Sequence, residues 1–190
     1  MHRYQILLGS KSPRRKSLLQ SLGFSFLVRT QDTAEKFPAQ LPAHEVAEYL
    51  ARQKADAFVQ LEAGELLITA DTTVVWHDEV MNKPQNKAEA VEMLRKLSGS
   101  DHYVYSGVCL KSTEKTYSFT GKTKVSFYKL SDAEIEAYIE QCKPYDKAGS
   151  YGIQEIIGHK SVKSIEGSYN NVVGLPTSQL YQVLKAEFGF

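Results

Sequence analysis

The feature that most constrains the fold is a short apolar run followed at once by a polar, basic one. Residues 4–8 indicate a buried strand, and residues 13–22 indicate a helix with Pro13 in its first turn and Gly23 as its stop. The loop 9–12 between them is rich in Gly and Ser. A strand that leads through such a loop into a helix presents free N–H groups where the helix dipole is positive. The segment fits a phosphate site, and it equally fits an ordinary strand–turn–helix with a basic surface.

The chemistry of this segment comes from two hydroxyls and several cations. Ser10 and Ser12 supply the hydroxyls, and Arg14 and Arg15 follow them directly. The loop is not a Walker loop, because the pattern Gly-x-x-x-x-Gly-Lys-[Ser/Thr] is absent. A dinucleotide fold has no support either, because Gly-x-Gly-x-x-Gly does not follow the strand.

Composition excludes several classes of protein. The chain has 190 residues, 42% of them hydrophobic and 24% charged, which is typical of one globular domain over residues 1–190. A net charge of +1 argues against an extended nucleic-acid surface. Cys109 and Cys142 are far apart and are interpreted as free thiols in a reducing compartment. No segment has the pattern of a membrane span or signal peptide, so we expect a cytoplasmic protein without a membrane partner.

Hydrophobic periodicity predicts alternating helices and strands. Helices are expected over 44–62, from 86 or 87 to 97, over 131–141 and over 176–187. Extended segments are expected over 24–30, over 66–76 as a strand pair or one long strand broken near Asp71, over 102–111 and 116–129 as a hairpin, and as two short strands before the last helix. This order indicates a mixed α/β fold.

Asp71 is the second informative position. It lies inside the apolar, β-branched run 66–76, where a buried carboxylate must be hydrogen-bonded, paired or given a metal. At the end of a strand it would serve as a general base or metal ligand. The alternative is a turn carboxylate without a chemical role.

Further cations and one amide complete the candidate site. Lys54 and Lys83 could add to the charge of Arg14 and Arg15 around a polyphosphate, although a lone lysine is usually only solvated. The Gly-containing segment 145–154 ends in Gln154, whose amide can both donate to and accept from uracil or thymine. A tight turn with an exposed glutamine is the other interpretation. The polar turn 165–176 either lines a pocket or only shapes the loop.

Together these segments resemble the Maf family of nucleoside triphosphate pyrophosphatases. The resemblance covers essentially all 190 residues and is carried by segments in the order and spacing of the family: 10–15, 70–72, 82–84, 146–149 and 172–176. The run 152–154, Gly-Ile-Gln, is similar to the branch that hydrolyses dTTP and UTP, not to the branch that prefers 7-methyl-GTP.

The resemblance implies a fold, a reaction and a metal. The fold would be an elongated mixed α/β domain with two lobes around a central cleft, related in shape to the inosine triphosphate pyrophosphatases. The reaction would cleave between the α- and β-phosphates with a divalent cation, Mg²⁺ or Mn²⁺. The resemblance also implies a homodimer that acts on a pyrimidine nucleoside triphosphate, while the argument against a nucleic-acid partner is the net charge of +1.

The resemblance also assigns roles residue by residue. Asp71 would be the catalytic base and, with Glu35, a metal ligand. The specificity positions would be Arg14, Thr72 and Gln154. The phosphate ligands would be Ser10, Ser12, Arg15, Lys54 and Lys83.

Three departures from the family pattern bear on the site. Lys11 stands where the family often has a small residue. The acidic pair after the first strands is rearranged, so that Glu35 aligns with the metal-site glutamate while Asp32 stays an alternative. Glu155 stands where glycine is usual, next to the base-recognising Gln154.

The sequence therefore predicts a dTTP/UTP pyrophosphatase. A glutamine amide accepts from N3–H of uracil or thymine and donates to a carbonyl, whereas cytosine presents the opposite pattern. Because the amide can flip, some hydrolysis of CTP is compatible with this logic. The sequence neither ranks dTTP above UTP nor excludes modified pyrimidine triphosphates. The alternative function is a non-catalytic nucleotide-binding regulator of cell division or shape.

Overall fold

The computed structural model describes residues 4–190, and its strands form one mixed seven-stranded sheet. The strand order is β2-β1-β3-β5-β6-β7, and β4 pairs with β3 beside this path. The strands are β1 (Gln5–Leu8), β2 (Phe26–Val28), β3 (Glu65–Trp76), β4 (Glu79–Met81), β5 (Asp101–Lys111), β6 (Thr116–Phe127) and β7 (Val162–Glu166). β1 pairs in parallel with β2 and β3, and the other pairs are antiparallel.

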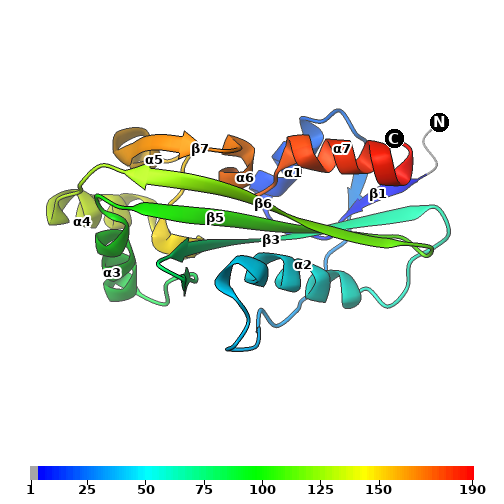
Figure 1. The fold of residues 1–190 in the computed structure, drawn as a ribbon, viewed down its shortest axis with the longest axis horizontal. Helices are drawn as coiled ribbons and strands as arrows, with labels where there is room; N and C mark the ends of the chain where they lie inside the picture. Colours follow the sequence, from blue (N-terminus) through cyan, green and yellow to red (C-terminus); the bar gives the residue numbers. More distant parts are fainter. Residues whose placement is uncertain (1–3) are drawn as a thin grey trace.

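Helices cover both faces of the long strands (Figure 1). α2 lies along one face, and α1, α6 and α7 lie over the other, while α3 and α4 sit near one end of the sheet. The helices are α1 (Pro13–Gln20), η1 (Ala43–Glu45), α2 (Val46–Asp56), α3 (Lys87–Leu97), α4 (Asp132–Cys142), η2 (Ala148–Ser150), α5 (Ile156–Ser161), α6 (Tyr169–Val173) and α7 (Thr177–Phe188). Among the described residues, none of these helices has the length and apolar character that crossing a bilayer requires.

The long strands β3, β5 and β6 join two lobes. β3 alone has 12 residues. Its first half packs into a core cluster with β1 and α7, through residues such as Leu66 and Ile68. Its second half reaches a different cluster with α3 and α4, through Val74. One continuous strand therefore belongs to both cores, and the middle of that strand lies between the lobes.

A glycine sets the distance between α2 and the sheet. Gly107 of β5 stands opposite Asp71 of β3 in the strand register. A Cβ at Gly107 would come within 2.3 Å of backbone atoms of Ala47 and Glu48 in α2. Only glycine leaves room for this approach, because heavy atoms cannot pack at that distance. The backbone of α2 therefore rests directly on the sheet beside Asp71.

The structure confirms the predicted mixed α/β architecture. It also confirms the hairpin 102–111/116–129 and the helices near 87–97, 131–141 and 176–187. The segment 66–76 belongs to one strand, and it is not broken at Asp71.

Two predictions were wrong. The helix expected over 44–62 ends at Asp56, because Phe58 and Leu61 pack from a loop against the cluster containing Leu7 instead of extending a helix face. One strand, β7, stands where two short strands were expected, and the short helix α5 precedes it.

Candidate active site

A cavity of about 470 Å³ opens at the middle of β3, between the two lobes. Such a volume lies within the usual range for small-molecule sites. Five cationic side chains and four carboxylates line it: Arg14, Arg15, Lys54, Lys83 and Lys147, and Glu35, Asp71, Asp146 and Glu155. The cavity is therefore highly charged, with a small excess of positive charge.

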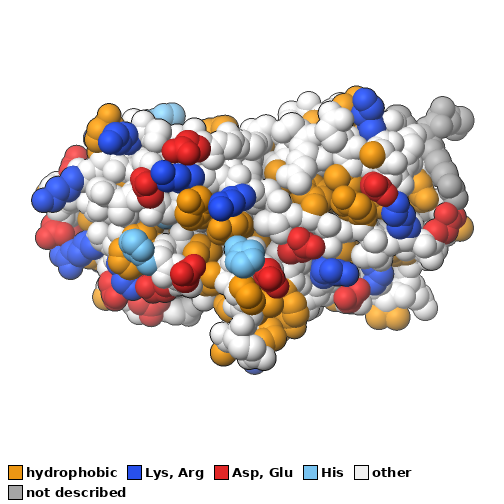
Figure 2. Space-filling model, in the orientation of Figure 1, with side chains coloured by type: hydrophobic (Ala, Val, Ile, Leu, Met, Phe, Trp, Pro, Cys, Tyr) orange, Lys and Arg blue, Asp and Glu red, His pale blue; other side chains and the backbone are white. Residues whose placement is uncertain are grey.

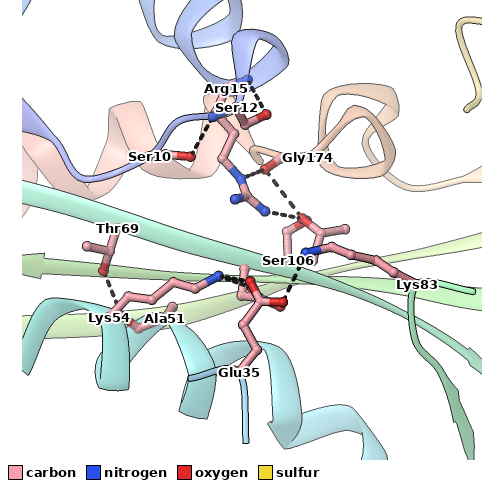
Figure 3. Close-up of polar contacts among 12 residues, drawn as sticks. Ser10, Ser12, Arg15, Glu35, Ala51, Lys54, Thr69, Lys83, Ser106 and Gly174 are labelled. Atoms are coloured by element: carbon pink, nitrogen blue, oxygen red, sulfur yellow. Dashed lines mark hydrogen bonds and ion pairs between the residues drawn. The ribbon is translucent and has the colours of Figure 1, made fainter. Parts of the chain in front are cut away.

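The start of α1 delivers Arg15 to this cavity. Ser12 is the N-cap of α1 and its hydroxyl accepts a hydrogen bond from the Arg15 backbone, while Pro13 begins the helix. The Arg15 guanidinium donates to the carbonyl of Gly174 at 3.0 Å and to Thr72 Oγ1 at 3.1 Å (Figure 3). Burial lowers the pKa of Arg15 from its ordinary value, and the charge of Asp71 opposes that shift. Arg15 is thus a fixed cation that ties α1 to β3.

The two predicted serines differ in position. Ser12 lines the cavity. The hydroxyl of Ser10 accepts from the Ser12 backbone N–H at 3.2 Å and shapes the loop before α1. Figure 3 shows both serines above the charged cluster, on the side of Arg15.

The central charged group comes from four different segments. Asp71 projects from the middle of β3 and is only 8% exposed. Lys54, from the last turn of α2, donates to Asp71 Oδ1 and to Glu35 Oε1, the latter at 2.9 Å. Lys83 donates to the other oxygen of Glu35 at 2.9 Å. The two lysines therefore hold Glu35 at the cavity, and Lys54 joins it to Asp71.

Electrostatics keep Glu35 ionised. Its partial burial alone would raise its pKa, but the hydrogen bonds and charges of Lys54 and Lys83 lower it from 4.5 to about 2. Asp32, the alternative acid, pairs with Lys11 at the surface, and its side chain is 92% exposed. Among the described residues, Glu35 and not Asp32 lines the cavity.

The candidate base site belongs to the same cavity. Gln154 lies there, exposed, between Ile153 and Glu155. Arg14 approaches from α1 and pairs with Asp146 at 3.4 Å. The structure thus brings the predicted positions Arg14, Thr72 and Gln154 to the same cavity as Asp71.

Sequence reasoning missed several polar residues of the site. Ser106 Oγ lies 2.8 Å from Thr72 Oγ1 and donates to the carbonyl of Asn171 at 2.9 Å. Ser106 lies opposite Thr72 because β3 pairs with β5, and no local sequence pattern predicts this contact. Lys147 also lines the cavity, but no role was predicted for it beyond its place in the segment 146–149.

The donor set fits one kind of metal site. In residues 4–190 no group of three or more His, Cys, Asp or Glu side chains could hold a metal ion. Mg²⁺ is commonly bound by one or two carboxylates together with substrate phosphates and waters, rather than by a cage made only of protein groups. Glu35 and Asp71, joined through Lys54, provide that smaller set of oxygen ligands.

Comparison with known structures concerns the fold. The chain is similar to a HAM1 protein from Coxiella burnetii, with a TM-score of 0.51 over 96% of this chain and 98% of that one. The sequence identity is 15%, so the similarity shows a shared mixed α/β fold and nothing about chemistry. In this chain the charged cavity lies at the junction of the two lobes of that fold.

Comparison of sequences is more specific. The chain belongs to the family described as Maf-like protein, whose model matches residues 5–187. It is 51% identical to a Bacteroides thetaiotaomicron protein named dTTP/UTP pyrophosphatase, over 97% of both chains. Proteins with the same name from Porphyromonas gingivalis and Flavobacterium johnsoniae are 47% and 43% identical, over 100% and 97% of this chain and 96% and 95% of their own lengths. The predicted family resemblance is confirmed.

Proposed function

We propose that this chain is an enzyme that hydrolyses dTTP and UTP to the nucleoside monophosphate and pyrophosphate. The observation that carries the proposal is a buried carboxylate, Asp71, that faces the same cavity as five cations. Binding a polyphosphate requires the cations. A protein that only binds the nucleotide would not require a carboxylate next to the bound phosphates, whereas hydrolysis requires a group that can take a proton from water. The relatives that bear the name dTTP/UTP pyrophosphatase support the same reaction.

The cationic side chains differ in how they are held. Arg15 is anchored by Gly174 and Thr72, so we propose that it orients the phosphates together with Ser12 and the N-terminus of α1. Lys54 and Lys83 bond only to Glu35 and Asp71 among the contacts described above. Their ammonium groups can turn to the phosphates, where they would offset charge as the bond breaks. Ser10 would contribute by shaping the loop.

Asp71 is the proposed general base. It would take a proton from a water molecule as the water oxygen bonds to the α-phosphorus and the bond from that phosphorus to the bridging oxygen breaks. The pyrophosphate leaves with the electrons of that bond. The strand position of Asp71, with α2 fixed against Gly107 next to it, holds the carboxylate in one place.

A divalent cation, Mg²⁺ or Mn²⁺, is the proposed cofactor. The cavity carries only one more positive than negative side chain, which is less than a triphosphate requires. Glu35 and Asp71 would hold the ion together with phosphate oxygens. When bound, it would supply Lewis-acid polarisation and additional positive charge.

Base selection is assigned to Gln154, with Arg14 and Thr72 placed around the same cavity. The amide of Gln154 can accept from N3–H of uracil or thymine and donate to the neighbouring carbonyl. Cytosine reverses both groups and would bind less well.

The deciding experiment measures pyrophosphate release from a panel of nucleoside triphosphates with Mg²⁺ or Mn²⁺. Wild type should hydrolyse mainly dTTP and UTP, and Asp71→Asn should be at least ~10²-fold slower while still binding nucleotide. Asp56→Asn, an exposed acid of α2 that pairs with Lys111, is the matched control. Absence of turnover in wild type, with nucleotide still bound, would instead support a regulatory binding protein.

The proposal also covers the cellular compartment, the class of partner and the oligomeric state. The free thiols Cys109 and Cys142 support a reducing compartment, and we propose the cytoplasm. In Figure 2 acidic and basic side chains are interspersed over the face shown, which supports a small-molecule substrate and not nucleic acid. A homodimer stays a prediction, which light scattering of the purified protein would test.

A further inference from the structure

The turn that carries Gln154 is closed on itself. The backbone N–H of Glu155 donates to the carbonyl of Gly152 at 3.0 Å, so residues 152–155 form one tight loop. Both ends of this loop meet the hydroxyl of Tyr138 on α4. The Gly152 N–H donates to that hydroxyl at 3.1 Å, and the hydroxyl donates to Glu155 Oε2. A single phenol group therefore clamps the two residues that flank the Ile153–Gln154 pair.

The packing inside the clamp is equally specific. A Cβ at Gly152 would lie 2.7 Å from Cδ of Glu155, so the glutamate side chain folds directly against the glycine. Burial and the bond to Glu155 raise the pKa of Tyr138 above its ordinary value, which keeps the hydroxyl protonated and able to donate. The carboxylate of Glu155 thus lies under the turn and supports its backbone.

The second oxygen of Glu155 continues the connection to the other specificity position. Lys147, whose side chain is 11% exposed, lies 3.0 Å from Glu155 Oε1 and donates to Asp146 Oδ1 at 2.6 Å. Asp146 Oδ2 in turn faces Arg14 at 3.4 Å. The chain of contacts runs from the turn of Gln154 to Arg14, along one side of the cavity.

We propose that Glu155, held by Tyr138 and Lys147, is a positioning residue that fixes the turn of Gln154 and thereby sets the preference for uracil over cytosine. The inference rests on the proposed function and deepens it. Gln154 is exposed, and in residues 4–190 no hydrogen bond holds its side-chain amide, so the place from which the amide can reach a base depends on the backbone turn that carries it. An amide on a loose turn could present either end to the base, and would then accept cytosine as well as uracil.

Two substitutions test the clamp. Tyr138→Phe removes the hydroxyl but keeps the ring, and Glu155→Gln keeps the shape but removes the charge that Lys147 faces. We expect Tyr138→Phe to reduce the preference for UTP over CTP by about tenfold, the effect of losing a buried hydrogen-bonding group. The change should appear in KM, with kcat for UTP within about threefold of wild type, because Tyr138 is outside the cavity lining. Glu155→Gln should give a smaller loss of preference.

Binding of UMP and CMP, measured by calorimetry, reads the same preference without turnover. The ratio of the two Kd values should fall in parallel with the ratio of kcat/KM. The double variant Tyr138→Phe/Glu155→Gln should be no less selective than Tyr138→Phe alone, because both changes remove the same support. Glu140→Gln is the control, since Glu140 lies on α4 and pairs with Lys87 through exposed side chains.

The outcomes separate clearly. A selective wild type whose preference is unchanged in both variants would overturn this proposal and leave the proposed function standing. Equal losses of kcat for UTP and CTP with unchanged KM would also overturn it, because Glu155 would then act on the reaction and not on the base. If Tyr138→Phe does not fold, the near-isosteric Glu155→Gln decides alone. A wild type that neither cleaves UTP nor prefers UMP would instead reject the proposed function.

Discussion

Lys54 places one ammonium group between two carboxylates, Glu35 and Asp71. It lies 2.9 Å from Glu35 Oε1 and also donates to Asp71 Oδ1. These are the two acids that we propose as metal ligands. In the free protein the lysine therefore neutralises the charge that would attract a divalent cation, and a bound triphosphate would draw the lysine away.

Replacement of this lysine should have opposite effects on metal and nucleotide. Lys54→Met keeps most of the side-chain volume and leaves the two carboxylates without their shared cation. We expect Mn²⁺ to bind the free variant more tightly than free wild type, because the carboxylates are then unneutralised. The KM for UTP should rise by about tenfold or more, because the proposed contact of Lys54 with the phosphates is lost. Calorimetry with Mn²⁺ alone and steady-state kinetics measure the two effects.

The control for this variant is Lys111→Met. Lys111 pairs with Asp56 and the carbonyl of Ala55, outside the cavity lining. Its Mn²⁺ affinity should match wild type. An unchanged Mn²⁺ affinity in Lys54→Met would contradict the competition between lysine and metal.

Arg15 should not be replaceable by lysine. Its guanidinium reaches Gly174 and Thr72 at the same time, and an ammonium group cannot reproduce that planar fork. Arg15→Lys should lower kcat/KM for UTP by about 10²-fold, since both the proposed phosphate contact and the hydrogen bond to Thr72 change. Steady-state kinetics would show this, with Arg52→Lys as the control on an exposed residue of α2. Activity close to wild type would argue that Arg15 serves only as a charge.

The buried His102 should make stability depend on pH. Its ring lies 2.8 Å from the hydroxyl of Tyr151, and burial lowers its pKa from 6.5 to about 4. Between these values the unfolded chain binds a proton and the folded chain does not. Stability is therefore complete above pH 6.5, falls as the pH decreases toward 4 and levels off below that, by up to about 3 kcal/mol in all.

Urea denaturation at pH 7 and pH 5 measures this dependence. In His102→Gln the difference in the free energy of unfolding between the two pH values should shrink. Glu35 contributes little to this difference, because its folded pKa of about 2 and its ordinary value of 4.5 both lie below pH 5. Its own contribution is present above pH 4.5 and lost toward pH 2. The same pH dependence in wild type and variant would assign the effect to other groups.

Gly107 is expected to tolerate no larger residue. In Gly107→Ala the new methyl group would collide with the backbone of α2, so the helix must move away from the sheet. We expect a loss of about 1–3 kcal/mol in stability. Activity should fall as well, because α2 carries Lys54 to Asp71. Thermal unfolding and the UTP assay measure both, with the exposed Ser164→Ala in β7 as the control. A fully active, equally stable variant would contradict this account of the packing.

Local pattern was enough to predict most of the elements. The helices expected from 86 or 87 and over 131–141 begin where Asn86 and Ser131 act as N-caps, and Ser131 makes a capping box with Glu134. The end of α2 was missed because Phe58 and Leu61 continue the helical spacing while packing from a loop. Spacing along the chain does not distinguish these two uses of an apolar side chain.

The candidate site was predictable only in part. Each of the predicted charges lies within a motif that can be found locally, and the structure places most of them around one cavity. Their partners depend on contacts between distant segments. Tyr138 and Glu155 are 17 residues apart, and Thr72 and Ser106 are 34 apart. Hydrogen bonds of this kind follow from the packing of lobes and strands, which no single segment encodes.

The continuity of β3 also limits how this molecule can be divided. One end of the strand is built into one core and the other end into the second, with Asp71 between them. A break anywhere from Glu65 to Trp76 would cut the strand that both cores share and would leave the proposed base, Asp71, with only one of them. We therefore expect that the halves cannot be exchanged with those of another chain as modules, because the strand that joins the two cores also carries the proposed base.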